Sequence, residues 1–211
     1  MTGSTREKTY GSVYLKRAYE SNTPDQQREV YDEWASLYDK EILGIHGYVA
    51  PRLAAATLLQ CTGGHPGRVL DAGCGTGLVG KEIGGGDIHG VDVSPGMLKQ
   101  AEETGAYASL QTMDLTRDLP LQDAEFDAVT CVGTFTHGHV GPSAIPELVR
   151  VTRPTGFVVA TVLEDMWEED GFASQVADLE SCGTCEVISK NVVPYRQAAG
   201  VNSLMLVLRR L

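Results

Sequence analysis

Apolar residues from residue 67 onward occur in two alternating patterns, which predict an α/β protein. Helical periodicity indicates helices at about 78–83, 95–105, 143–152 and 165–181. Short apolar runs typical of buried strands lie between them, at 67–73, 87–93, 107–114, 126–134 and 156–163. Two further strands, at about 184–193 and 202–210, have no helix between them and should therefore pair antiparallel. We predict a Rossmann-like, doubly wound sheet of seven strands, parallel except for this C-terminal pair.

The N-terminal part has a different pattern. Residues 1–22 are polar and are expected to form a flexible arm. Thr23 and Pro24 predict a helix start, with Gln26 closing a capping box. A second helix is expected at about 48–60. We therefore divide the single domain into the arm, a helical lid at 23–62 and a core at 63–211.

Composition narrows the class of partner. The chain has 211 residues, of which 42% are hydrophobic and 21% charged, as in an ordinary globular protein. The net charge of −11 and the scattered basic residues argue against nucleic acid, because phosphate binding needs a basic patch. We expect a cytoplasmic monomer or homodimer without a membrane anchor, acting on a small molecule or a protein side chain. The Cys182–Cys185 pair is expected to be part of a turn, and no metal site is expected.

The stretch VLDAGCGTGLVG, residues 69–80, carries the first chemical signal. Its glycines fit both a G-x-G-x-x-G and a tighter G-x-G-x-G pattern, and either allows a ligand to approach the backbone. Asp92 follows Gly75 by 17 residues and can accept hydrogen bonds from both ribose hydroxyls. These residues alone do not separate a nicotinamide dinucleotide from other adenosine ligands.

Three features favour another adenosine ligand. Asp71 precedes the first glycine by two residues, and we expect its carboxylate to face the ligand, repel a pyrophosphate and attract an ammonium group. Asp114 is placed to accept from an exocyclic amine such as that of adenine. The terminal antiparallel strand pair is an addition that a simple dinucleotide-binding half does not need.

The segments VLDAGCGTG, GVDVSPGML, MDL and FDAVTCVG, in this order and spacing, resemble the motifs of class I S-adenosylmethionine-dependent methyltransferases. VYDEWASLYDKEI, YVAPRLA and SAIPELVRVTRPTG are similar to the Williams–Beuren-region methyltransferase-like proteins. One departure is RPTG, where the family usually has Pro-Gly-Gly and this chain has Thr155. The resemblance implies S-adenosylmethionine as cofactor and S-adenosylhomocysteine as product. The implied cofactor-binding residues are Tyr38, Asp71, Gly73, Gly75, Gly77, Asp92, Val93, Met97, Asp114, Leu115, Val132 and Gly133.

The acceptor is less defined. Methyl transfer needs alignment of the acceptor, and it needs a base only if the acceptor is protonated. His137 and His139 are the candidate bases, and because they are two residues apart we expect one to face the site, with His137 favoured. The candidate substrate-binding residues are His46, Tyr48, Glu164 and Tyr195.

We therefore predict a methyltransferase acting on an O-, N- or C-acceptor in a small organic molecule. The alternative on the same fold is an enzyme that binds S-adenosylmethionine without methylating, of the cyclase or eliminase type. A nicotinamide-dependent oxidoreductase and a regulatory module without an acceptor pocket stay open at this point.

Overall fold

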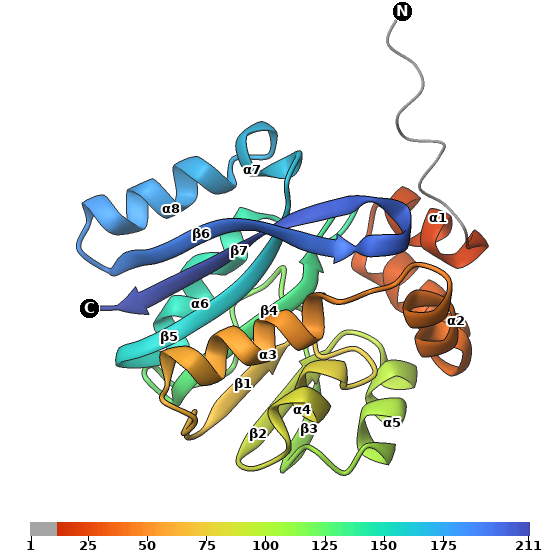
Figure 1. The fold of residues 1–211 in the computed structure, drawn as a ribbon, viewed down its shortest axis with the longest axis horizontal. Coiled ribbons are helices and arrows are strands. Elements are labelled where there is room, and N and C mark those ends of the chain that lie inside the picture. The colour runs from red at the N-terminus through yellow and green to blue at the C-terminus, as the bar shows by residue number, and fades with distance from the viewer. Residues whose placement is uncertain (1–11) are drawn as a thin grey trace, which may run out of the picture.

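The computed structural model describes residues 12–211, and its centre is one seven-stranded sheet (Figure 1). The strand order is β3-β2-β1-β4-β5-β7-β6. The first five strands in this order run parallel, and β7 pairs antiparallel with both β5 and β6. The predicted fold class is thereby confirmed. The strands are β1 (Val69–Ala72), β2 (Ile88–Asp92), β3 (Ser109–Thr112), β4 (Phe126–Phe135), β5 (Thr152–Leu163), β6 (Cys185–Arg196) and β7 (Val201–Arg210).

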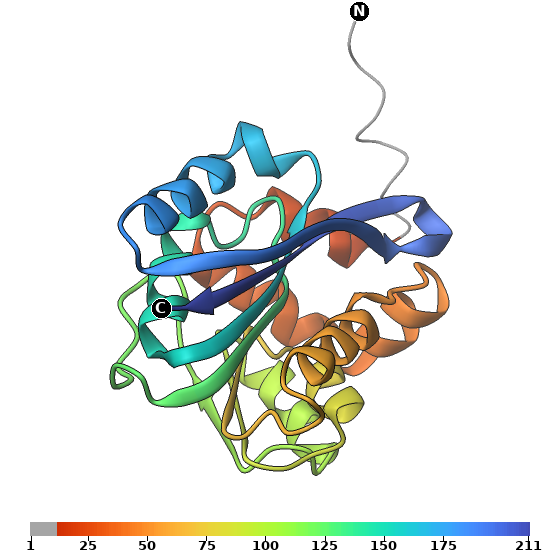
Figure 2. The same ribbon diagram turned by 60° about the vertical axis from the view of Figure 1, so that its left-hand side comes forward.

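Helices cover the two faces of this sheet (Figure 2). One layer is formed by α3 (Ala50–Cys61), α4 (Leu78–Ile83) and α5 (Pro95–Glu103), with α3 packed on β4, β5 and α4. α6 (Ile145–Val151) packs on β5 and α8 (Phe172–Ser181) packs on β6, on the other side. Strands β1 and β4 lie between the layers, and every residue of β1 is buried. In the described part of the chain, we find no helix with the length and apolarity to cross a membrane.

Two helices, α1 (Val13–Glu20) and α2 (Pro24–Gly44), precede the core (Figure 1). The expectation of a flexible arm is therefore wrong for 13–20, whereas 1–11 lie outside the described residues. Leu15 and Ala18 are three residues apart, so a helix can bury both on one face. The Tyr14 ring stacks on Trp34 of α2 at 5.8 Å between centroids.

Helix α2 begins as predicted, with Thr23 as the N-cap and Pro24 in the first turn. The Thr23 side chain accepts a hydrogen bond from the Gln26 backbone N–H. The Gln26 side chain reaches back to the backbone N–H of Asn22 instead of that of Thr23.

The helix predicted at 165–181 is interrupted. It consists of α7 (Met166–Glu169) and α8, separated by Gly171 in the left-handed region with φ of +84°. Glycine carries no Cβ and adopts this conformation without steric cost, which ends the first helix. Thr155 also has a positive φ, +68°, at the RPTG position where the family usually has glycine.

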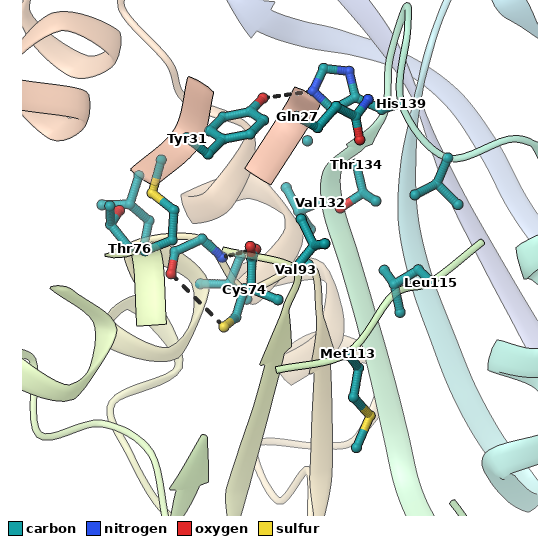
Figure 3. A pocket seen from close by; sticks show the side chains of 18 of the residues that line it. Gln27, Tyr31, Cys74, Thr76, Val93, Met113, Leu115, Val132, Thr134 and His139 are labelled. Carbon is teal, nitrogen blue, oxygen red and sulfur yellow. Dashed lines mark hydrogen bonds between the residues drawn. The ribbon is translucent and has the colours of Figure 1, made fainter. Parts of the chain in front are cut away.

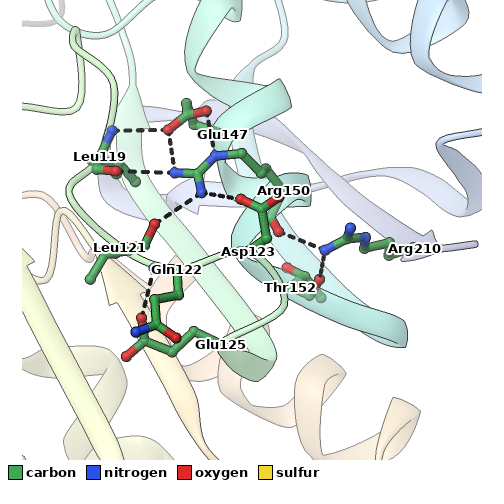
Figure 4. Close-up of polar contacts among 9 residues, drawn as sticks. All are labelled: Leu119, Leu121, Gln122, Asp123, Glu125, Glu147, Arg150, Thr152 and Arg210. Atoms are coloured by element: carbon green, nitrogen blue, oxygen red, sulfur yellow. Dashed lines mark hydrogen bonds and ion pairs between the residues drawn. The ribbon is translucent and has the colours of Figure 1, made fainter.

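Residues 113–125 connect β3 to β4 as a loop that is held from outside by Arg150 of α6 (Figure 4). The Arg150 guanidinium donates to the Leu119 carbonyl at 3.1 Å and to the Leu121 carbonyl at 2.9 Å. It also forms ion pairs with Glu147 and Asp123, at 2.7 and 2.6 Å. Loop 113–125 therefore has a defined shape without a helix of its own.

Candidate functional site

A partly open cavity lies where β1, β2, β3 and β4 end, next to α2 (Figure 3). Ligands bind in this position, at the carboxyl ends of the strands, in open α/β sheets. The cavity is lined by twelve of the residues predicted from the sequence: Tyr38, Tyr48, Gly73, Gly75, Asp92, Val93, Met97, Asp114, Leu115, Val132, Gly133 and His139. Six others do not line it: His46, Asp71, Gly77, His137, Glu164 and Tyr195.

The glycine loop brings bare backbone to the cavity. A Cβ on Gly73 would lie 2.2 Å from the Thr134 hydroxyl oxygen, so the loop can approach β4 only with glycine there. Gly75 has a φ of +54°, and nothing lies within 4 Å of where its Cβ would be. That empty space is available to a ligand. A Cβ on Gly77 would instead meet Tyr107 and Ala101, and Gly77 does not line the cavity, so close packing requires a glycine at this position.

Asp92 lies at the end of β2 and connects two cofactor loops. One carboxylate oxygen accepts from the Gly75 backbone N–H at 2.9 Å, and the other from the Ser94 N–H at 2.9 Å. Each oxygen keeps a second lone pair for a ligand hydroxyl. Burial raises the pKa of Asp92, although the backbone hydrogen bonds act in the opposite direction. Val93 and Met97 line the cavity beside it.

Asp114 and Leu115 follow β3 and also line the cavity. The Asp114 carboxylate accepts from the Thr116 backbone N–H at 2.9 Å and from the Arg117 side chain at 3.2 Å. Burial acts to raise the pKa of Asp114, but the hydrogen bonds from Thr116 and Arg117 outweigh it, so the pKa is lowered. Asp114 is therefore an ionised acceptor at neutral pH, as its predicted contact with an adenine amine requires.

Asp71 corrects a prediction, because its carboxylate does not face the cavity. One oxygen accepts from the Tyr107 hydroxyl at 2.7 Å and the other from the Thr130 hydroxyl at 2.8 Å. The residue is 1% exposed, and burial raises its pKa to about 6. The Tyr107 hydroxyl in turn accepts from the Gly80 N–H at 3.2 Å, so Asp71 anchors the packing of β1 against Tyr107 and the start of α4.

Helix α2 is bonded to three of the loops around the cavity. Asp39 accepts from the Thr76 hydroxyl at 2.5 Å, in the glycine loop. Asp32 accepts from the Ser94 hydroxyl at 2.6 Å and from the Gly96 N–H at 2.8 Å, at the start of α5. The Gln27 side chain donates to the Gly138 carbonyl, after β4. These bonds hold α2 against the open side of the cavity. The sequence had not indicated a role for Asp39, Asp32 or Gln27.

The two histidines after β4 differ in position. His137 does not line the cavity and its Nε2 contacts Asp165 at 3.0 Å, so the expectation that His137 is the histidine that faces the site is not met in this structure. His139 lines the cavity, and its Nε2 lies 2.7 Å from the Tyr31 hydroxyl (Figure 3). The His139 Nδ1 lies 2.7 Å from the His137 carbonyl, which only accepts, so Nδ1 carries the proton and Nε2 accepts from Tyr31.

This environment weakens His139 as a base. Burial lowers the pKa of His139 to about 4, so the ring is neutral at pH 7. A histidine with this pKa binds a proton poorly near neutrality. The Tyr31 oxygen still has lone pairs with which to accept a hydrogen bond from a ligand.

Among the four residues predicted to bind the substrate, only Tyr48 lines the cavity. Gly133 makes this possible, since a Cβ there would lie 2.4 Å from the Tyr48 hydroxyl oxygen. Tyr195 is buried behind Tyr48, with the ring centroids 5.0 Å apart. His46 is buried away from the cavity and Glu164 is exposed, so neither has the expected contact with it.

Several lining residues were missed by sequence reasoning. Tyr31 was one that periodicity could have indicated, because Gln27, Tyr31 and Tyr38 share one face of α2. Thr76 lies between two glycines of the loop that was predicted to bind the ligand, so its position in the sequence could have indicated that it lines the cavity. For Thr134 there was no local signal, since its place on the wall depends on how β4 meets the glycine loop.

Comparisons with known proteins point to the same part of the chain as the cavity. The family described as "Methyltransferase domain" matches residues 70–160, which contain the glycine loop, Asp92 and Asp114. The human protein named Methyltransferase-like protein 27 is 44% identical over 142 residues, which are 64% of this chain and 57% of that protein. The demethylmenaquinone methyltransferase of Beutenbergia cavernae is 32% identical over 161 residues, 72% of this chain and 65% of that protein. The chain thus spans less than two thirds of the length of either relative.

Among solved structures, the [4+2]-cyclase SpnF superposes with a TM-score of 0.67, covering 90% of this chain and 97% of that chain. The sequences are 18% identical, so this likeness shows the fold alone.

Proposed function

We propose that the chain is a class I S-adenosylmethionine-dependent methyltransferase, with S-adenosylmethionine as cofactor, and that it methylates a small organic molecule. One observation carries the proposal. A single cavity runs from the acids that follow β2 and β3 to a group of polar aromatic side chains at the end of β4, Tyr31, Tyr48 and His139. Cofactor and acceptor can therefore meet in one cavity. The name of the Beutenbergia cavernae relative, which specifies a small acceptor, supports this assignment.

The cofactor-binding residues in this proposal are those predicted from the sequence that line the cavity. Asp92 holds the ribose hydroxyls, and Asp114 with Leu115, Val93 and Met97 surrounds the adenine. Gly73, Gly75 and Tyr38 lie around the methionine part, and Val132 and Gly133 lie near the sulfonium. Residues 23–62 act as a lid, which the bonds from α2 to the three loops support.

The acceptor end positions its substrate without a strong base. S-adenosylmethionine supplies an activated methyl group, and the protein has to align the acceptor with it and exclude water. We assign His139 to positioning: it fixes the Tyr31 hydroxyl, whose oxygen can accept a hydrogen bond from the acceptor. Such a site suits an acceptor atom that is already unprotonated at neutral pH.

A metabolite screen with methyl-tritiated S-adenosylmethionine tests the function directly. We expect tritium in a small-molecule product that requires the protein. A product formed without tritium would instead support the cyclase or eliminase alternative. If no metabolite fraction yields any product, the result would count against both the methyltransferase and this alternative.

The histidine assignment has its own test. In His139→Ala we expect turnover to fall at least tenfold, with affinity for S-adenosylhomocysteine within threefold of the wild type. His137→Ala is the matched control and should keep near-normal turnover. The reverse ranking of the two variants would contradict the assignment. The cytoplasmic location and the monomeric or homodimeric state remain predictions.

A further inference from the structure

Arg196, the last residue of β6, is a buried cation that forms no ion pair with the described residues 12–211. The residue is 1% exposed, and its Nε and Nη1 atoms are buried without a hydrogen-bond partner. Among residues 12–211, no carboxylate forms an ion pair with Arg196. A buried guanidinium is normally paired, because removing its charge from water is costly. Arg196 therefore has two N–H donor atoms that no other residue in 12–211 uses.

Two aromatic rings contact the Arg196 guanidinium, and the Glu41 carboxylate acts on the neighbouring His46 without forming an ion pair with Arg196. The guanidinium carbon of Arg196 lies 5.6 Å from the Tyr19 ring centroid and 5.8 Å from that of Tyr195. His46 is nearby, since the Ala198 backbone N–H, two residues after Arg196, donates to the His46 carbonyl at 3.2 Å. The His46 Nε2 atom is also buried without a partner. Burial and the charge of Arg196 lower the pKa of His46, so His46 adds no second positive charge.

Arg196 does not line the cavity but lies one layer behind the wall of its acceptor end. Tyr48, which lines the cavity, forms an isolated β-bridge with Arg196, and the Tyr48 ring packs on Tyr195. On the other side, the Tyr19 ring lies 6.0 Å from the ring of His139, which also lines the cavity. The two aromatic rings that contact the guanidinium thus pack directly on cavity residues of the acceptor end. None of these neighbours belongs to the glycine loop.

We propose that Arg196 binds a carboxylate group of the methyl acceptor, at a subsite behind Tyr48 and His139. This inference rests on the proposed function, in which the cavity holds a small organic acceptor. A carboxylate carries one negative charge, which matches the single unpaired cation, and its planar shape suits the donors of a guanidinium. A phosphate dianion would bring a second negative charge, which the single Arg196 cation does not match. The acceptor is accordingly a small carboxylic acid that Arg196 orients.

The test follows the Arg196 side chain directly by NMR. The Nε–Hε signal is assigned as the one missing from Arg196→Met, and protein saturated with S-adenosylhomocysteine is titrated with acetate and benzoate. We expect both anions to shift this signal, whereas their neutral counterparts acetamide and benzamide leave it unchanged. A signal that responds to neither anion, or equally to the amides, would overturn the proposal. No turnover is measured, so the result is independent of whether methyl transfer is demonstrated.

Variants separate binding from structure. By calorimetry, Arg196→Met should bind benzoate at least tenfold more weakly, Arg196→Lys should keep part of the affinity, and the exposed Arg52→Met should match the wild type. Without ligand, Arg196→Met should unfold at a higher temperature, because it removes an unpaired buried charge. A lower unfolding temperature in both Arg196 variants, with unchanged benzoate binding in Arg196→Lys, would indicate a structural role and contradict the proposal.

The cofactor also carries a carboxylate, and a third experiment distinguishes binding of that carboxylate by Arg196 from binding of an acceptor carboxylate. S-adenosylhomocysteine has the amino-acid carboxylate and 5′-methylthioadenosine lacks it. We expect Arg196→Met to bind both with wild-type affinity. A selective loss of S-adenosylhomocysteine binding would assign Arg196 to the cofactor and refute an acceptor subsite.

Discussion

Replacing Asp92 with asparagine removes one of two carboxylate oxygens, each of which binds a backbone N–H at 2.9 Å. The same two oxygens are the proposed acceptors for the ribose hydroxyls. Asparagine keeps one oxygen and presents an amide N–H₂ in place of the other. The variant therefore retains one of the two proposed ribose contacts and loses the negative charge.

A hydrogen bond to a charged group contributes about 1.5–3 kcal/mol. Affinity for S-adenosylhomocysteine should therefore fall roughly 10- to 150-fold in Asp92→Asn. Stability should change less than affinity, because burial of the ionised carboxylate is itself unfavourable, as its raised pKa indicates. The lost backbone hydrogen bond and the removed desolvation cost act in opposite directions.

Isothermal titration calorimetry at pH 7.5 measures the affinity, and denaturant unfolding measures the stability. Asp118→Asn is the control, since Asp118 is exposed on loop 113–125. Affinity within twofold of the wild type would refute the ribose role of Asp92. A loss of affinity matched by an equal loss of stability would show that Asp92 acts only by connecting the two loops.

Four further predictions concern stability. Thr155→Gly should stabilise the protein by about 1 kcal/mol in denaturant unfolding, because a β-branched residue at a φ of +68° is strained; an unchanged or lower value would count against strain there. Gly80→Ala would place a methyl group 2.5 Å from the Tyr107 ring and should cost about 1–3 kcal/mol, whereas a neutral effect would show that the ring moves aside. The pKa of His139 is lowered to about 4 in the folded protein, so acid protonates this histidine in the unfolded chain first and lowers the free energy of unfolding as the pH falls from 6.5 toward 4. Between pH 7 and pH 4 the wild type should lose about 3 kcal/mol of this free energy relative to His139→Phe. Parallel pH profiles of the two proteins would contradict this. Arg150→Met should destabilise by about 3 kcal/mol and increase amide exchange across loop 113–125, and normal protection of that loop would show that the clamp is dispensable.

The sequence alone determined the order and type of most elements from residue 23 onward and the position of the cofactor loops. Strand and helix periods are local properties, and the glycines, Asp92 and Asp114 each follow a strand whose apolar run is visible in the chain. Parallel strands bring their carboxyl ends to one edge, so the location of the cavity followed from topology. The interruption at Gly171 was not recognised because a helix pattern continues on both sides of it.

Only the tertiary structure decided which side chains face the cavity. His137 and His139 have equal chemistry in sequence, and contacts of 2.7 Å to Tyr31 and 3.0 Å to Asp165, from segments far away along the chain, give them different places. Asp71 turned from the cavity because Tyr107 and Thr130, 36 and 59 residues away, satisfy its carboxylate.

Arg196 had no signal in the sequence at all. Whether a charged side chain is exposed, paired or buried without a partner depends on every segment that packs around it. These long-range contacts form only when the chain has folded. A local sequence pattern therefore predicts where a site lies, but it does not predict which side chains in the folded protein keep unused hydrogen-bond donors.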